Sequence, residues 1–195
     1  MDEERAIQLC LKHRDPIGFE FLVMKYRREA FFHASNLLGN PEDALDACQD
    51  AFARAFAAIP RLQTLTQFYP WFYRILRNRC LNLLARRQTS DRYRHAQSQS
   101  PDLSSAEAPA EPRAALEQQE EKLRVRRALE RLRPGFREIL TLKYLEKRSY
   151  EEIAQLLGIP RGTVMSRLFH ARAALREAYV NESNLSSTHQ EACHE

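Results

Sequence analysis

Apolar residues recur at helical spacing over most of the chain, in two blocks separated by a polar stretch. The first block runs from about residue 4 to residue 87, and the second from about residue 114 to residue 179. Apolar positions at i, i+3, i+4 and i+7 favour amphipathic helices, and the period-two alternation that favours strands is missing. The pattern therefore predicts an all-α chain with two small helical domains, residues 1–95 and residues 114–180.

Helix-capping and helix-breaking residues divide the first block into separate helices. Gly39 and Asn40 follow a long periodic run and predict its C-terminal end; Asn40 can then cap the next helix, with Pro41 in its first turn. Pro60 is expected to end that helix. The predicted helices cover residues 6–13, 19–38, 41–59 and 68–87, with a loop of residues 61–67 before the last of them.

Two segments contain little that a core could bury. Residues 96–113 combine three prolines with Ser, Ala and Gln, a composition typical of a flexible tether. Residues 181–195 are polar, and we expect a disordered tail. Residue types that can bind zinc occur here and near the N-terminus, as His189, Cys193, His194, Cys10 and His13. We favour incidental His and Cys in a disordered tail, and expect no bound metal or cofactor.

Residues 149–177 have the pattern of a helix-turn-helix. Ser149 followed by Glu152 predicts a capped first helix, Gly158 permits a tight turn, and Pro160 suits the start of the second helix. In that second helix one apolar stripe is predicted to face the core, and it consists of Val164, Leu168, Ala171 and Leu175.

The outer face of this second helix carries an aromatic ring that needs a partner. Phe169 lies opposite the apolar stripe, with Gly162, Ser166 and His170, and arginines border it. The alternative, a generic helical hairpin, would carry Glu, Lys or Gln on a solvated face. In a DNA major groove, a ring can contact thymine methyl groups, Ser and His can bond base edges, and arginines can reach phosphates. We therefore predict that Phe169 contacts DNA.

Two further surfaces are predicted in the first block. Its last helix interleaves aromatic residues with arginine, which is typical of binding to single-stranded nucleic acid; an ordinary amphipathic helix with every ring in the core is the alternative. The helix before it has an acidic, amide-bearing edge that would repel DNA. Such an edge favours a protein partner with a basic surface, with a merely solvated face as the alternative.

The composition of the chain restricts its possible partners, compartment and activity. The chain has 195 residues and a net charge of +4, which is weak support for a polyanionic partner. Four widely spaced cysteines without a CxxC pair fit a reducing compartment, and no apolar run approaches the roughly 20 residues of a membrane span, so we expect a cytoplasmic protein. Gly-rich phosphate loops, nucleophile elbows and paired carboxylates in an apolar setting are missing, so an enzyme is not expected.

Three motifs in order resemble those of the extracytoplasmic-function (ECF) RNA polymerase sigma factors. Region 2.2 of that family is similar to DALDACQDAFARAF (residues 43–56), and regions 2.3–2.4 to WFYRILRNRCLNLLARR (residues 71–87). Region 4 is similar to LRPGFREILTLKYLEKRSYEEIAQLLGIPRGTVMSRLFHARAAL (residues 132–175). The resemblance implies an initiation factor that binds core RNA polymerase and promoter DNA, with region 2 in residues 1–95 and region 4 in residues 114–180.

The resemblance also implies roles for individual residues. Docking on the clamp helices of the polymerase β′ subunit would fall on Asp43, Asp46, Gln49, Asp50 and Arg54. Capture of the melted non-template strand of the −10 element would fall on the loop from Arg61 to Gln67 and on Trp71, Arg74, Arg77, Asn78 and Asn82. Reading of the −35 element would fall on Arg161, Thr163, Met165, Ser166, Arg167, Phe169, His170 and Arg172. The polymerase β flap and an anti-sigma factor are further partners that the resemblance allows.

Some positions depart from the usual residues of the family. Asp50 stands where Glu is usual, Arg79 where an apolar residue is common, and Met165 and His170 where basic residues are frequent. The rival interpretation is a repressor or response-regulator-like effector, which would place its helix-turn-helix as a dimer on palindromic DNA without polymerase. That rival leaves the first block without a function.

Overall fold

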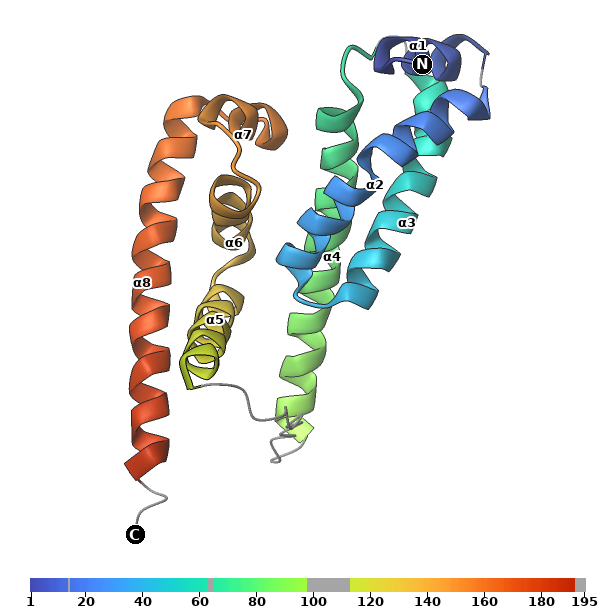
Figure 1. Cartoon of the computed structure of the whole chain (residues 1–195). Helices are drawn as coiled ribbons and strands as arrows, with labels where there is room; N and C mark the ends of the chain where they lie inside the picture. Colours follow the sequence, from blue (N-terminus) through green and yellow to red (C-terminus); the bar gives the residue numbers. More distant parts are fainter. Residues whose placement is uncertain (14, 63–64, 98–112, 192–195) are drawn as a thin grey trace.

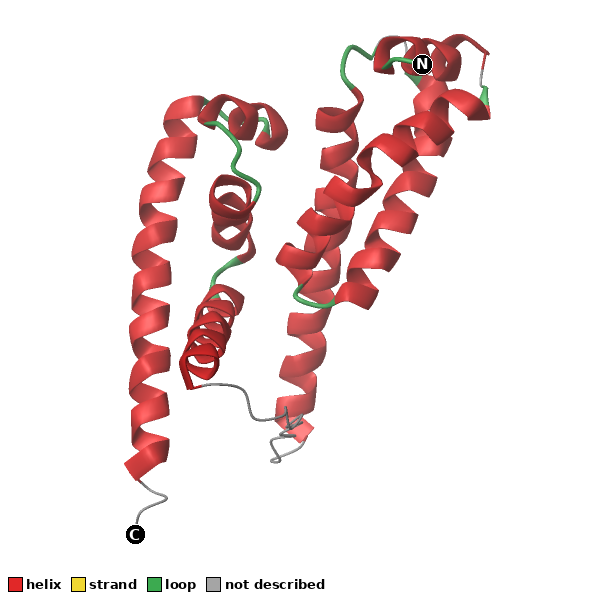
Figure 2. Ribbon diagram, viewed as in Figure 1, coloured by secondary structure: helices red, strands yellow, loops and turns green. Residues whose placement is uncertain are grey.

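The computed structural model describes residues 1–13, 15–62, 65–97 and 113–191, and every regular element within them is helical. Figure 2 shows helices joined by short loops and no strand in the described part of the chain. This confirms the predicted all-α class. The helices of the first block and those of the second form two groups (Figure 1).

The first domain is built from long helices with short helical turns at two of their ends. Their bounds are α1 Glu3–Gln8, a π-helical turn Leu9–His13, α2 Pro16–Leu38, α3 Pro41–Ala58, a 3-10 turn Ile59–Arg61, and α4 Phe68–Gln97. The predicted helix end and cap are confirmed. Helix α2 ends at Gly39, with φ of +73°, and the Asn40 side chain accepts hydrogen bonds from the backbone N–H groups of Glu42 and Asp43. Pro60 lies in the turn after α3.

Aromatic rings from α2, α3 and α4 fill the middle of the first domain. Phe72 is fully buried and stacks on Phe52 and Phe68, with ring centroids 4.3 Å and 5.4 Å away. Phe19 of α2 meets Phe68 edge-on at 6.1 Å. Stacked and edge-on pairs stabilise a core beyond the area that they bury. This cluster therefore fixes how α4 lies against α2 and α3.

Helix α4 is longer than predicted. It continues past Arg87, the predicted end, to Gln97. The predicted tether, residues 96–113, thus begins inside α4 and ends on the first residue of the next helix, while residues 98–112 lie outside the described part of the chain.

The second domain is arranged along one long helix. Its elements are α5 Arg113–Arg131, α6 Pro134–Leu140, a π-helical turn Thr141–Leu145, α7 Tyr150–Leu157 and α8 Arg161–Glu191. In Figure 1, α5, α6 and α7 follow one another along the side of α8. The predicted core stripe of α8 is confirmed: Val164, Leu168 and Ala171 are buried, and Leu175 is partly buried.

The prediction of a disordered tail from residue 181 is wrong for residues 181–191, which continue α8. Two contacts join α8 to α5 at the start of this part of the helix: the buried Glu182 pairs with Arg131, and just before it the Tyr179 hydroxyl donates a hydrogen bond to Glu121 at 3.0 Å. A polar segment shows no apolar stripe in the sequence, so its pattern does not reveal that an ion pair anchors it. Residues 192–195 lie outside the described part of the chain.

The two domains contact each other, and their buried apolar residues form one continuous cluster. On the first domain the contact involves α2 and α4; on the second it involves α6, the turn Thr141–Leu145 and α7. Hydrogen bonds cross the boundary, among them those from Tyr73 to Glu138 and between His33 and Glu146. The sequence predicted two tethered domains but not this contact.

Candidate DNA-binding and polymerase-binding surfaces

The turn between α7 and α8 sets the direction of the second helix of the helix-turn-helix. Ser149 Oγ accepts a hydrogen bond from the Glu152 backbone N–H, and the Glu152 carboxylate accepts one from the Ser149 backbone N–H, so the predicted capping box is present. Gly158 then adopts φ of +65° and ψ of +38°, a left-handed conformation that favours glycine. With Ile153 and Leu156 of α7 buried, this geometry holds α8 at a fixed angle.

The N-terminal part of α8 presents a mixed aromatic and polar face to solvent. Phe169 is 63% exposed, and its ring meets the His170 ring edge-on at a centroid distance of 5.5 Å. Burying a Phe side chain is worth about 1.5–3 kcal/mol, so a ring left in water has that much to gain from a partner. Seven of the eight residues predicted to read the −35 element are exposed and Thr163 is half-buried, the seven being Arg161, Met165, Ser166, Arg167, Phe169, His170 and Arg172.

Polar contacts near this face leave it free to bind. Arg161 pairs with Glu151 of α7 at 3.0 Å, and both side chains are more than half exposed. An exposed pair of this kind contributes about 0–1 kcal/mol, so a phosphate can compete for the arginine. The Ser166 hydroxyl donates to the Thr163 carbonyl at 3.1 Å and keeps lone pairs that can accept from a base.

On α4 the structure brings most of the predicted strand-binding residues to the outer side. Arg74, Asn78 and Asn82 are exposed, while Arg77 and Trp71 are half-buried. The Trp71 ring meets the Phe68 ring edge-on at a centroid distance of 5.8 Å, so part of it packs on the aromatic cluster. Arg61, at the start of the predicted loop, is also exposed, and residues 63–64 of that loop lie outside the described part of the chain.

The positions of two tyrosines narrow the sequence interpretation of α4. Tyr69 and Tyr73 are among the aromatic residues near the start of this helix for which base stacking and burial in the core were both open, and both are buried. Burial, followed by the neighbouring Glu138 carboxylate, raises the pKa of Tyr73 well above its ordinary value. The alternative of core aromatics thus holds for these two rings, and Trp71 is left as the aromatic residue of α4 that could stack on a base.

Glu138 of α6 is a site residue that the sequence interpretation missed. It is 1% exposed and accepts hydrogen bonds from Tyr73 Oη at 2.9 Å and from Arg77 Nε at 2.6 Å. Burial would lower the pKa of Arg77, but the hydrogen bond to Glu138 raises it. The available signal was a carboxylate inside the apolar run FREILTL, because a charge in such a run needs a buried partner.

Part of the acidic edge of α3 is paired within the first domain. Asp50 accepts hydrogen bonds from Arg54 Nε at 2.9 Å and pairs with Arg79 Nε of α4 at 2.8 Å. The Asp50–Arg79 pair explains one departure from the usual family residues, since Asp50 supplies the negative charge that Arg79 needs at a commonly apolar position. The Arg54 side chain is 63% exposed and can reach a partner.

On the rest of this edge, one predicted residue is paired and two are exposed. Asp43 pairs with Arg87 of α4, whereas Asp46 and Gln49 are exposed. Leu45, between them, is 51% exposed. Acidic and amide groups around an apolar side chain are typical of the rim and centre of a protein interface.

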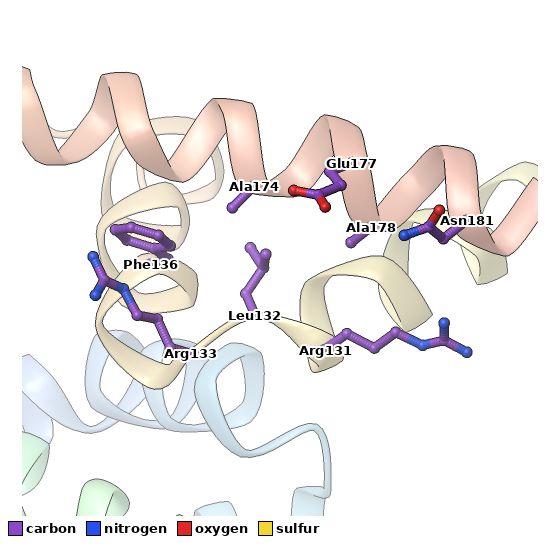
Figure 3. Close-up of a pocket in the computed structure, with 8 residues that line it drawn as sticks. All are labelled: Arg131, Leu132, Arg133, Phe136, Ala174, Glu177, Ala178 and Asn181. Atoms are coloured by element: carbon purple, nitrogen blue, oxygen red, sulfur yellow. The ribbon is translucent and has the colours of Figure 1, made fainter.

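A groove of about 320 Å³ opens beside α8, at the turn between α5 and α6. Figure 3 shows Leu132 pointing from this turn toward Ala174 and Ala178 of α8. The Arg133 guanidinium lies over the Phe136 ring, 3.5 Å from its centroid. Apolar walls with a charged rim suit the docking of a short helix.

The described part of the chain contains no candidate metal site and no candidate membrane span. No group of three or more His, Cys, Asp or Glu there is arranged to hold a metal ion. The side chains of His13, His189, Cys193 and His194 are outside that part. Zinc binding by these residues therefore remains an untested alternative to incidental His and Cys. No helix that the structure describes is both long and apolar enough to span a bilayer.

Both domains match known protein families. Residues 22–90 match Sigma-70 region 2, and residues 122–175 match Sigma-70, region 4. The chain is 32% identical to the ECF RNA polymerase sigma-E factor of Escherichia coli (strain K12), over 83% of this chain and 86% of that protein. It is 29% identical to the RNA polymerase sigma-H factor of Pseudomonas aeruginosa, over 91% of this chain and 94% of that protein.

Solved structures share the fold. CnrH, solved in complex with the cytosolic domain of CnrY, aligns with a TM-score of 0.60 and 26% identity over 90% of this chain and 96% of that one. RpoE of Bartonella quintana, solved with the anti-sigma factor NepR, aligns with a TM-score of 0.57 over 82% of this chain and 95% of that one; at 22% identity it supports the fold alone. Region 2, region 4 and these relatives together show that the chain belongs to the ECF RNA polymerase sigma factors, which direct core RNA polymerase to specific promoters.

Proposed function

We propose that this chain divides promoter recognition between its two domains, with α8 reading the duplex −35 element and α4 capturing the melted −10 strand. The observation that carries the proposal is the exposed face of α8 around Phe169, which matches the chemistry of a major groove and not that of a solvated helix. A helix-turn-helix places the N-terminal end of its second helix against base edges. In this role Phe169, Ser166 and His170 contact bases, while Arg161, Arg167 and Arg172 contact phosphates.

In the −10 element, α4 acts on single-stranded DNA. Its exposed Arg74 and the loop residue Arg61 follow the phosphates, Asn78 and Asn82 bond bases, and the half-buried Trp71 offers the exposed part of its ring. Capture of an unstacked base stabilises an opening that the polymerase drives, so the chain itself performs no chemical step.

Core polymerase would hold the two domains at the promoter. The α3 edge of Asp46, Gln49 and Arg54, with Asp43 and Asp50 behind it, is the proposed contact with the β′ clamp helices. The groove around Leu132 and Phe136 is the proposed seat for a helix of the β flap (Figure 3). With both domains held, the second DNA contact forms at high effective concentration, so two modest contacts make one specific complex.

An anti-sigma factor is the further partner that we propose. Support comes from the solved relatives, since CnrH carries the cytosolic domain of CnrY and RpoE carries the anti-sigma factor NepR. We place the protein in the cytoplasm, where bacterial polymerase and promoters are.

Titration of the purified chain with core polymerase, followed by transcription in vitro, tests the proposal. RNA from defined start sites is expected only when both components are present. Asp46→Lys should weaken polymerase binding by about tenfold or more, because like charge would then face a basic surface. Glu20→Lys, the same change on an exposed glutamate of α2, should leave binding unchanged. Binding of palindromic duplex DNA by a dimer, without polymerase and without RNA, would instead support the repressor.

A further inference from the structure

The chain begins with a short helical segment that lies where α3 ends and α4 begins (Figure 1). It consists of α1 and the turn Leu9–His13, and we call it the N-terminal segment. The residues predicted to bind DNA or polymerase all lie outside it, yet Ala6, Ile7 and Cys10 are buried in the core. The segment is therefore an integral part of the first domain and can set the geometry of the elements that it contacts.

Glu3 ties this segment to the first turn of α4. Its Oε1 accepts a hydrogen bond from the Phe68 backbone N–H at 3.1 Å, across 65 positions of sequence. The first N–H groups of a helix have no partner within the helix. Gln67, just before α4, is not of a type favoured as an N-terminal cap, and Pro70 has no N–H to donate. Glu3 thus caps α4 from another helix, and its negative charge suits the positive end of the helix dipole.

The other carboxylate oxygen of Glu3 is held by α2. Lys25 Nζ lies 2.5 Å from Oε2, and the Tyr26 hydroxyl donates a hydrogen bond to the same atom. The Tyr26 ring in turn stacks on the rings of Phe68 and Tyr69, at centroid distances of 5.7 Å and 5.0 Å. Burial would raise the pKa of Glu3, but the hydrogen bonds that it accepts lower it, so the carboxylate is ionised at neutral pH. The start of α4 is therefore joined to both α1 and α2 through one charged group.

The N-terminal segment also contacts the end of the α3 side of the loop. The turn Leu9–His13 contacts the turn Ile59–Arg61. Ile59 is 1% exposed, and its carbonyl accepts a hydrogen bond from the Leu62 backbone N–H at 3.1 Å, while the Arg61 side chain is exposed. The segment thus contacts the chain on both sides of the connection between α3 and α4.

Close packing leaves the segment little room to move on α2. A Cβ added to the buried Gly18 would lie 2.5 Å from the Ala6 carbonyl oxygen and 2.9 Å from Leu9 Cβ. Real Cβ atoms essentially never approach other atoms this closely. Only glycine at this position therefore lets the segment lie where it does.

The two ends that the segment contacts carry residues that we assign to the −10 strand. Arg61 belongs to the turn Ile59–Arg61, and Trp71 lies in the first turn of α4, with its ring edge-on to Phe68 at 5.8 Å. Phe68 is fully buried, and its backbone N–H is the group that Glu3 accepts from. A shift in the start of α4 would therefore displace Trp71. A strand that bound a loosely held helix start would have to supply the free energy that orders it.

We propose that Glu3 is a positioning residue for capture of the −10 strand: its carboxylate holds the first turn of α4 while the N-terminal segment holds the turn Ile59–Arg61, so that Arg61 and Trp71 meet the strand at a fixed spacing. Glu3 itself does not touch DNA in this role. The inference deepens the proposed function and rests on the assignment of α4 to the −10 strand.

Binding of the holoenzyme to two DNA probes tests the inference. Both probes take their sequence from a promoter at which the chain starts RNA in vitro. One is a duplex with the −35 element alone, and the other extends the same duplex by a single strand with the non-template −10 element. The ratio of the two dissociation constants measures what the strand contributes to binding. Glu3→Ala should reduce this contribution by about tenfold, because a charged hydrogen bond no longer holds the start of α4, and it should leave binding of the duplex probe unchanged.

Three more variants complete the test. Glu4→Ala, on the exposed neighbour in α1, is the matched control and should change neither probe. Glu3→Gln keeps an oxygen that can accept from the Phe68 N–H and should recover part of the loss. Tyr26→Phe keeps the stacked ring but removes one hydrogen bond to Glu3, so it should reduce the strand contribution by about two- to threefold. This variant decides the question if Glu3→Ala does not fold.

The ratio also separates positioning from a general effect on folding. A partly unfolded domain would weaken binding of both probes alike, so an equal loss on both would overturn the inference. An unchanged ratio in both Glu3→Ala and Tyr26→Phe would overturn it as well.

The wild-type holoenzyme shows which proposal has failed. If the single strand does not strengthen wild-type binding, the assignment of α4 to the −10 strand fails, and the role of Glu3 fails with it. If the strand strengthens binding equally in the wild type and in the variants, the proposed function stands and the positioning role alone fails.

Discussion

Replacement of Phe169 by alanine is expected to change which upstream sequences the holoenzyme prefers. The side chain is 63% exposed, which leaves about 125 Å² of a ring of about 200 Å² free to contact DNA. At about 25 cal/mol per Å², complete coverage would be worth about 3 kcal/mol, and contact through one face about 1.5 kcal/mol. Phe169→Ala should thus weaken binding to the preferred element by roughly tenfold. Stability should change by less than about 0.5 kcal/mol, because the ring does not contribute to the core.

The assay uses holoenzyme reconstituted with core polymerase and a DNA library with a randomised −35 element joined to one constant downstream sequence. Sequencing of the bound DNA gives the preference at each position for the wild type and for Phe169→Ala. The preference should flatten at one or two positions and persist at the others. Arg172→Ala is the control, since loss of a phosphate contact should weaken all sequences alike and lower the salt dependence. If Phe169→Ala also weakened every sequence by the same factor, direct base reading by this ring would be refuted.

Three further predictions concern the folded chain. Gly158→Ala should lower the free energy of unfolding by about 1–2 kcal/mol, because a Cβ is unfavourable at φ of +65°. Gly162→Ala should be neutral or stabilising, because nothing lies within 4 Å of an added Cβ. Urea denaturation of both variants compares them, and equal losses of stability would contradict the assigned turn. The backbone N–H of Ser149 lowers the pKa of Glu152, so its carboxylate stabilises the fold above the ordinary value of 4.5 and loses this effect as the pH falls through the lower folded pKa. The difference in Tm between wild type and Glu152→Gln should therefore shrink on acidification, and a constant difference would count against the capping box. Burial raises the pKa of both Cys48 and Cys80 to about 12, so iodoacetamide at about pH 8 should modify them only in urea; mass spectrometry of their peptides checks this, and modification of the native chain would show that they are accessible.

The features that the sequence predicted well depend on near neighbours. The Ser149 cap, the Gly39 and Gly158 turns and the Val164 stripe follow from spacings of three or four residues, and all are present. The exposure of Phe169 follows in the same way, because the opposite side of an amphipathic helix is fixed once its core stripe is known.

The features that the sequence did not show depend on distant partners. Tyr73 is buried because Glu138, 65 residues away, accepts from its hydroxyl group. Residues 181–191 stay helical where Glu182 reaches Arg131 on another helix. The unusual Arg79 became understandable only with Asp50 beside it. Each case is a polar pair, and hydrophobic periodicity contains no information on which two charges will meet.

Helix α8 also works as a lever. Its 31 residues make a rod about 46 Å long, with base-reading side chains at one end and the Glu182 anchor toward the other. Glu182 lies 21 residues, or about 32 Å, from Arg161, so a tilt of only about 5° at the anchor would swing the reading tip by about 3 Å, close to the roughly 3.4 Å step between base pairs. The accuracy with which this tip meets its target thus depends on how firmly α5 clamps the opposite end of the rod.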